Sequence, residues 1–187
     1  MNKLHLSGAR RILAFVGEDG RSRLSPEEQA PRVAEYSATP GMRTSILWST
    51  MQMPRVPQGN DDPVPSLESV HPAPGGSTFL TLTLPPDSVY GAPDFDPVAA
   101  GAEQARIVPG IAERMEPDAP GFHTTQTIDY VILLAGEVWL VVDEGEVRLQ
   151  PGDVVIQLGS RHAWQNRSSE PATLGVILLG AESNSAK

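Results

Sequence analysis

The distribution of proline divides this chain of 187 residues into two parts. Sixteen of the 18 prolines fall between Pro26 and Pro120, whereas residues 121–179 contain only Pro151 and Pro171. Proline lacks the backbone N–H that a sheet requires and fixes φ, so it is confined to edge strands, turns and coil. The first part is therefore expected to contain short edge strands, turns and surface coil, and the second part a more continuous β-structure.

The second part alternates apolar segments with turn signals. The apolar segments are TIDYVILLAG (127–136), EVWLVVDEGEVRLQPGD (137–153), VVIQLGSRHAWQN (154–166) and ATLGVILLG (172–180). Residues 143–145 and the pair Pro151-Gly152 have the composition of tight turns. Short strands at this spacing predict an all-β sandwich or barrel.

The first part contains a few local signals of its own. The segment RRILAFVGEDGRSRLS (10–25) indicates a hairpin, and TSILWST (44–50) and STFLTLTLPP (77–86) indicate strands. Two segments favour a helix, SPEEQAPRVAEY (25–36) with a serine N-cap and DPVAAGAEQA (96–105).

Composition excludes several classes of protein. A formal net charge of -9 and a pI near 4.8 argue against a nucleic-acid partner, because such proteins concentrate Lys and Arg on one face. The absence of cysteine removes disulfides, thiolate zinc sites and cysteine nucleophiles, so a metal would need N and O ligands. No apolar run approaches the length of about 18 residues that a membrane-spanning helix needs. We expect a soluble, cytoplasmic protein with no membrane partner.

Polar side chains interrupt the apolar pattern at two places. Alternate residues of a strand share one face of the sheet. The first set contains His123, Thr125, Thr127 and Asp129, and the second contains His162, Trp164 and Asn166. Both sets adjoin apolar strands, and we expect them to face one barrel interior.

These two sets resemble the two sequence motifs of the cupins, a family of small double-stranded β-helix (jelly-roll) proteins. The first motif reads G-x5-H-x-H-x3-E-x6-G. His123 takes the first His position and Gly136 the closing Gly, whereas Thr125 stands at the second His and Asp129 at the Glu. The resemblance covers residues 120 to 180, about a third of the chain.

The second motif reads G-x5-P-x-G-x2-H-x3-N. Gly152, Gly159, His162 and Asn166 match it, and Gln157 stands one residue before the position of the Pro. The resemblance implies an all-β cupin jelly roll with an extended Pro-rich N-terminal region. We expect residues 1–119 to wrap the barrel as part of the same domain, residues 120–180 to form its core, and residues 181–187 to form a flexible tail.

The resemblance also implies a site. Metal-binding cupins hold a divalent ion with the residues of both motifs, which here leaves His123, Asp129 and His162 as ligands for Fe, Mn, Ni or Zn. Such an ion would polarise a carbonyl, enol or carboxylate group for dehydration, isomerisation, cyclisation or decarboxylation, and Fe would also permit O2 chemistry. In a metal-free alternative, one of the two histidines acts as general base and Asp129 orients it. A third reading is a cupin that binds a small ligand without chemistry.

Further residues beside these three are candidates for substrate contact. The candidates are Thr125, Gln157, Arg161, Trp164 and Asn166. A flat indole suits an aromatic ligand, and a guanidinium suits a carboxylate. Gln157 and Asn166 have two readings, since each either orients an imidazole or satisfies loop backbone. The resemblance implies a homodimer and a small-molecule substrate.

Overall fold

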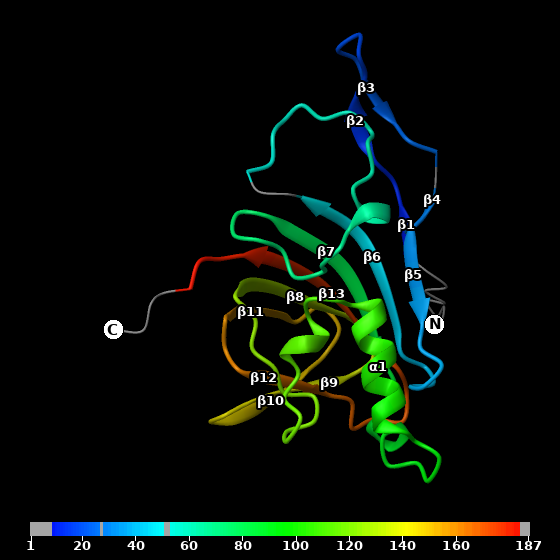
Figure 1. Ribbon diagram of the computed structural model, residues 1–187, viewed down its shortest axis with the longest axis vertical. Coiled ribbons are helices and arrows are strands. Elements are labelled where there is room, and N and C mark those ends of the chain that lie inside the picture. Colours follow the sequence, from blue (N-terminus) through cyan, green and yellow to red (C-terminus); the bar gives the residue numbers. More distant parts are fainter. Residues whose placement is uncertain (1–8, 27, 51–52, 184–187) are drawn as a thin grey trace.

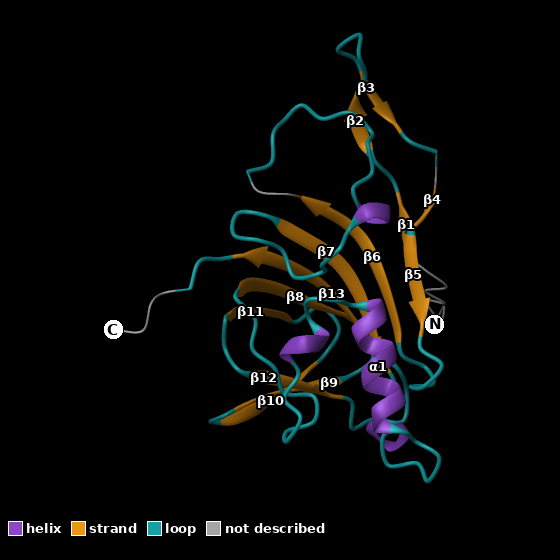
Figure 2. Ribbon diagram, viewed as in Figure 1, coloured by secondary structure: helices purple, strands orange, loops and turns teal. Residues whose placement is uncertain are grey.

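The computed structural model describes residues 9–26, 28–50 and 53–183. Two antiparallel sheets form its body (Figures 1 and 2). The larger has the order β11-β8-β13-β7-β6-β5 and the smaller the order β10-β9-β12. The chain passes from sheet to sheet between β8 and β13, which is the winding of a double-stranded β-helix. The predicted all-β jelly roll is confirmed.

The strands of the larger sheet are β5 (Arg32–Glu35), β6 (Arg43–Thr50), β7 (Ser77–Leu84), β8 (Thr127–Ala135), β11 (Val154–Leu158) and β13 (Ala172–Gly180). Those of the smaller sheet are β9 (Val138–Val142), β10 (Gly145–Leu149) and β12 (His162–Gln165). Two small sheets pair β1 (Arg10–Arg11) with β4 (Glu28–Gln29), and β2 (Ala14–Val16) with β3 (Ser22–Leu24). The helices are α1 (Pro97–Ile107) and the 3-10 turns η1 (Val64–Ser66), η2 (Asp87–Val89) and η3 (Ala112–Arg114).

The hydrophobic core lies on the inner face of the larger sheet. One row of directly paired residues crosses five strands of it and is apolar throughout, namely Val155, Val131, Val176, Leu80 and Ile46. Side chains from the Pro-rich part, Val64, Val70 and Ile107, join the same buried cluster. Full burial of such a side chain stabilises the fold by about 1.5–3 kcal/mol, so both parts of the chain contribute to one core.

Of the two helices predicted in the first part of the chain, the one over residues 96–105 is present and the one over residues 25–36 is not. Helix α1 begins where the sequence predicts it, because the Asp96 side chain accepts hydrogen bonds from the backbone N–H of Val98 and Ala99. The helix predicted over residues 25–36 is wrong, since that segment forms β4 and β5 instead. Pro31 lies inside it, and pairing of β5 with β6 outweighs the weak helical preference.

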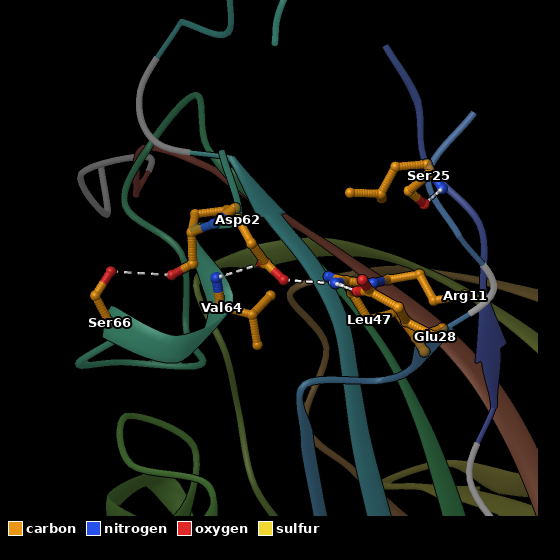
Figure 3. Close-up of polar contacts among 9 residues, drawn as sticks. Arg11, Ser25, Glu28, Leu47, Asp62, Val64 and Ser66 are labelled. Atoms are coloured by element: carbon orange, nitrogen blue, oxygen red, sulfur yellow. Dashed lines mark hydrogen bonds and ion pairs between the residues drawn. The ribbon is translucent and has the colours of Figure 1, made fainter. Parts of the chain in front are cut away.

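Arg11 attaches the N-terminal strands to the larger sheet (Figure 3). Its guanidinium is buried and donates to the Leu47 carbonyl oxygen of β6 at 3.2 Å and to Asp62 at 2.5 Å. It also lies 5.9 Å from the centre of the Trp48 ring. A buried cation needs charged and hydrogen-bonding partners of this kind, so Arg11 ties β1, β6 and the loop containing Asp62 together.

Among the described residues, no helix combines the length and apolar composition needed to span a membrane.

Gly136, the closing Gly of the first motif, connects β8 to β9 with a φ of 79°. A Cβ at this position would lie 2.5 Å from the Pro171 carbonyl oxygen and 2.6 Å from the Ala172 Cα. These neighbours are backbone atoms and cannot move aside. Only glycine satisfies both the positive φ and the close approach.

We predict that Gly136→Ala destabilises the protein far more than Gly152→Ala. Gly152 also has a positive φ, 99°, but a Cβ there would meet nothing within 4 Å. The control variant therefore measures backbone strain alone, about 1–2 kcal/mol, whereas Gly136→Ala adds a clash and should cost more than about 3 kcal/mol. Urea unfolding of both variants gives the comparison. Equal losses would show that the turn relaxes around the added methyl group.

Candidate functional site

His123 and His162 lie side by side where the segment before β8 meets the start of β12. The two residues form an antiparallel bridge in which each backbone N–H donates to the other's carbonyl oxygen at 3.0 Å. Their ring centroids are 4.2 Å apart, with an angle of 54° between the ring planes. His162 is 2% exposed, whereas His123 is partly exposed. The sequence placed them in separate segments, and the backbone bridge joins them.

Both imidazoles have the same hydrogen-bonding arrangement. Nδ1 of His123 lies 3.1 Å from the Gly121 carbonyl oxygen, and Nδ1 of His162 lies 2.9 Å from the Ser160 carbonyl oxygen. Because a carbonyl oxygen only accepts, Nδ1 must carry the proton and donate it. In the neutral ring this leaves a lone pair on each Nε2.

Burial keeps this pair uncharged. It lowers the pKa of His162 to about 4, and the neighbouring His123 adds to this effect. Burial also lowers the pKa of His123, but the Gly121 carbonyl and the negative charge of Glu116 oppose that change. Both rings are therefore neutral at pH 7, and His123 is the more basic of the two.

Asp129 and Gln157 form a second polar group on the inner face of the larger sheet. They are direct partners on β8 and β11, and both are buried. Asp129 Oδ1, Gln157 Nε2 and Gln157 Oε1 have no hydrogen-bond partner among the described residues. Burial raises the pKa of Asp129, and the hydroxyls of Thr127 and Thr125 partly oppose this. Buried polar atoms without partners are costly, so they indicate a place for a ligand or water.

Thr78 of β7 extends this group to a third strand. It pairs with Leu178, which in turn pairs with Asp129, so all three residues lie in one row across the sheet. The Thr78 side chain is fully buried and its Oγ1 has no partner in the described structure. We call Thr78, Asp129 and Gln157 the polar row. Thr78 is not among the residues predicted from the sequence, although the alternation in STFLTLTL places it on the same face as Leu80.

The predicted metal ligand set is not assembled. In the described parts of the chain, no group of three or more His, Cys, Asp or Glu side chains is arranged to hold a metal ion. His123 and His162 are held together by their bridge, whereas Asp129 lies in the polar row, opposite Gln157. Protein metal sites with open positions use about three protein ligands, so this donor set does not fit a divalent ion. Thr125, at the second His position, accepts a hydrogen bond from Thr127 at 2.7 Å.

Arg161 already has carboxylate partners within the protein. Its Nε and Nη2 donate to Glu116 at 2.8 and 2.7 Å, and its Nη1 donates to Asp143 at 2.6 Å. The guanidinium also lies 4.1 Å from the centre of the Phe122 ring. The side chain predicted to meet a substrate carboxylate thus ties the segment before β8 to the smaller sheet, next to His162.

The Asn166 side chain likewise has partners within the protein, both in its own loop and at the end of β7. Its Nδ2 donates to the carbonyl oxygens of Leu84 and Glu170 at 3.2 and 2.8 Å, and its Oδ1 accepts from the backbone N–H and hydroxyl of Ser168. Of the two readings, satisfaction of loop backbone is the one that the structure shows. Trp164 is partly buried, packs against the core and has its ring 6.0 Å from that of His162.

Comparison with known proteins adds a family and several relatives. Residues 113–178 match the family model of the cupin domain. Phomopsin biosynthesis cluster protein D of Diaporthe leptostromiformis is 53% identical over 47 residues, which are 25% of each chain. The cupin-domain-containing oxidoreductase srdB of Neurospora crassa is 40% identical over 76 residues, 37% of this chain and 39% of that protein. The chain thus matches only about a quarter of the length of the first curated relatives.

Solved structures also resemble the chain. The cupin domain of Schizosaccharomyces pombe Cnp3 is 10% identical, with 91% of this chain and 87% of that chain covered and a TM-score of 0.46. A cupin 2 conserved barrel domain protein of Salinispora arenicola is 16% identical, with 75% and 76% covered and a TM-score of 0.38.

We predict that the protein loses stability as the pH falls from about 6.5 to about 4, and that His162→Gln removes much of this loss. In that range the unfolded histidine binds a proton that the folded one, with a pKa of about 4, does not. Each pKa unit corresponds to about 1.4 kcal/mol, so His162 accounts for up to about 3 kcal/mol. Thermal unfolding at a series of pH values measures the effect.

His71→Gln is the matched control for this prediction. His71 is a partly buried histidine outside the pair, and burial also lowers its pKa. The variant should retain most of the pH dependence. A His162→Gln protein with the same pH profile as the parent would contradict the assignment.

We predict that Thr78→Val raises stability by about 1 kcal/mol, because it removes a buried hydroxyl that has no partner. Thr127→Val is the matched control, since the Thr127 hydroxyl donates to Thr125 and its loss should destabilise the protein by about the same amount. Denaturant unfolding of the two variants measures both changes. Destabilisation by Thr78→Val would instead mean that the hydroxyl serves the fold.

Proposed function

The chain belongs to the cupin superfamily through residues 113–178, and on this premise we propose that it is a small-molecule enzyme in which His123 and His162 transfer a proton. One observation carries the proposal: two neutral imidazoles lie in contact, each with Nδ1–H bound to a backbone carbonyl and a lone pair left on Nε2. A positioned lone pair of this kind is what a general base requires.

The two histidines have different roles in this proposal. His123 is the base, because it is partly exposed and the charge of Glu116 stabilises its protonated form. His162 is more deeply buried and stays neutral, so its Nε2 accepts a hydrogen bond from a hydroxyl or enol of the substrate. The Arg161 ion pair with Glu116 holds that carboxylate near the imidazoles.

In this proposal the polar row binds the polar head group of the ligand. It offers two donors, Gln157 Nε2 and the Thr78 hydroxyl, and two acceptors, Asp129 Oδ1 and Gln157 Oε1. The apolar row of Val155, Val131 and Val176 lies beside it on the same face. A ligand that fits has an apolar body and a head group with adjacent donor and acceptor atoms.

The proposed reaction class is proton transfer next to a carbonyl group, as in isomerisation, dehydration or cyclisation. Neutral imidazoles perform this step without a Lewis acid, and we derive no metal-dependent step because the donor set does not fit a metal ion. The relative srdB, which matches 37% of this chain, is named a cupin-domain-containing oxidoreductase. That name supports an enzymatic role, and removal of a proton is the part of an oxidation that this pair can supply.

The experiment is hydrogen–deuterium exchange at carbon. Acetylacetone, ethyl acetoacetate and oxaloacetate are incubated with the full chain in D2O, and loss of the α-proton signals is followed by NMR. We predict exchange above the buffer rate and a decrease of about 100-fold or more in His123→Gln, the typical contribution of a general base. His71→Gln is the matched control and should keep the parent rate, and so should the parent treated with a chelator.

Two results would contradict the proposal. Exchange at the buffer rate with all three compounds would favour a cupin that binds a ligand without chemistry. Activity that is lost with chelator, together with about one equivalent of Fe, Mn, Ni or Zn by elemental analysis, would restore the metal-dependent mechanism.

A further inference from the structure

Gln157 is buried with both ends of its amide unbonded. The residue is 3% exposed, and neither Nε2 nor Oε1 has a hydrogen-bond partner among the described residues. Asp129, its direct partner on β8, is 4% exposed, and its Oδ1 is also without a partner there. Buried polar side chains are hydrogen-bonded in the large majority of proteins. Two neighbouring exceptions therefore indicate that a third group binds both side chains.

The two side chains do not satisfy each other. Directly opposite residues of an antiparallel pair have Cα atoms about 4.5–5.5 Å apart, yet no hydrogen bond joins Gln157 to Asp129 in the described structure. Their neighbours along the two strands, Ile156 and Tyr130, are exposed on the outer face of the sheet. Because side chains alternate along a strand, Gln157 and Asp129 point inward. They present three unbonded atoms to a group on that side.

Thr78, the third member of the polar row, is too distant for the same small head group. It lies two strands from Asp129, with Leu178 of β13 between them (Figure 1). Neighbouring strands are about 4.7–4.9 Å apart, so Thr78 and Asp129 are separated by roughly 9–10 Å. A small head group that contacts Gln157 and Asp129 thus has to match one donor and two acceptors.

These three atoms select the polar group of the ligand. Gln157 Nε2 donates, whereas Gln157 Oε1 and Asp129 Oδ1 accept. A ketone, ester or ether has no N–H or O–H and leaves both acceptors unpaired. A hydroxyl group has one O–H and reaches only one of them. A primary carboxamide carries two N–H groups and one C=O in a single plane, which is the complementary set.

Charge argues against ionic ligands at this position. A carboxylate would face Asp129, and the nearby guanidinium of Arg161 is already bound to Glu116 and Asp143. An ammonium or guanidinium ion only donates, so it would leave Gln157 Nε2 without an acceptor. Burial of an ion without a counter-charge also costs far more than burial of a neutral amide. A neutral head group fits best.

We propose that the site takes a substrate with a primary carboxamide, which Gln157 and Asp129 bind together. The C=O of the ligand accepts from Gln157 Nε2, one N–H donates to Gln157 Oε1, and the other N–H donates to Asp129 Oδ1. The next inward pair along the two strands is Val131 and Val155, which contacts the apolar body of the ligand. This inference rests on the proposed function, which assigns the polar row to the substrate.

The test is binding of benzamide to the full chain, measured by isothermal titration calorimetry. Benzamide has no α-proton, so its binding is independent of proton transfer. N,N-dimethylbenzamide keeps the ring and the carbonyl but has no N–H, and it should bind at least about 10-fold more weakly because two buried acceptors stay unpaired. Benzoate should also bind at least about 10-fold more weakly. Equal affinity for benzamide and its dimethyl derivative, or no binding of benzamide, would overturn the proposal.

Gln157→Met tests the residue itself. The variant keeps the length of the side chain and removes two buried atoms without partners, so the free protein should unfold at the same or a higher temperature than the parent. It should bind benzamide at least about 10-fold more weakly. Ile156→Met is the matched control, since Ile156 is the neighbouring residue of β11 but is 52% exposed on the outer face. It should keep the parent affinity. Parent affinity in Gln157→Met, or equal losses in both variants, would contradict the assignment.

The benzamide experiment and the proton-exchange experiment fail independently of each other. Binding of benzamide without exchange at carbon would support the carboxamide site and contradict only proton transfer by the histidine pair. Exchange at carbon without binding of benzamide would contradict the carboxamide site and leave proton transfer in place.

Discussion

The register of β8 between β11 and β13 is the constraint on which both the site and the core depend. It sets Asp129 beside Gln157 and Leu178, and Val131 beside Val155 and Val176. Because strand side chains alternate with a period of two, a slip of one residue would turn the core side chains of β8 outward and the outward-facing ones inward. The apolar inner row prevents this slip, since exposing it would forfeit several kcal/mol. Packing of the apolar row thus positions the polar row next to it.

The histidine pair depends on a different interaction, the reciprocal backbone hydrogen bonds between His123 and His162. These bonds fix the separation of the two backbones, and the carbonyl oxygens of Gly121 and Ser160 then hold the rings and fix the tautomer. Burial lowers the pKa of both histidines and so keeps both rings neutral at pH 7. Threonine at the second His position of the first motif leaves Thr125 bonded to Thr127 rather than facing a metal. The chain thus departs from the motif at Thr125 while the jelly-roll architecture persists.

The architecture could be predicted from the sequence because it depends on local rules that recur along the chain. Turn glycines, apolar runs and proline positions each specify short pieces, and β6, β7 and β8 lie close to where those pieces predict them. The failures arise where a partner distant in sequence decides the outcome. In the segment 25–36, residues 32–35 pair with β6 instead of forming a helix. Arg161 binds Glu116 and Asp143, and Asn166 binds the Leu84 carbonyl oxygen. No spacing rule within one segment reveals a partner 82 residues away.

The polar row lowers the stability of the larger sheet at its edge strand, β11. Each buried polar atom without a partner costs about 1–3 kcal/mol, so Gln157 alone makes β11 a weak edge of the sheet. In the proposed function, a ligand that hydrogen-bonds to the Gln157 amide removes that cost, so binding should stabilise β11.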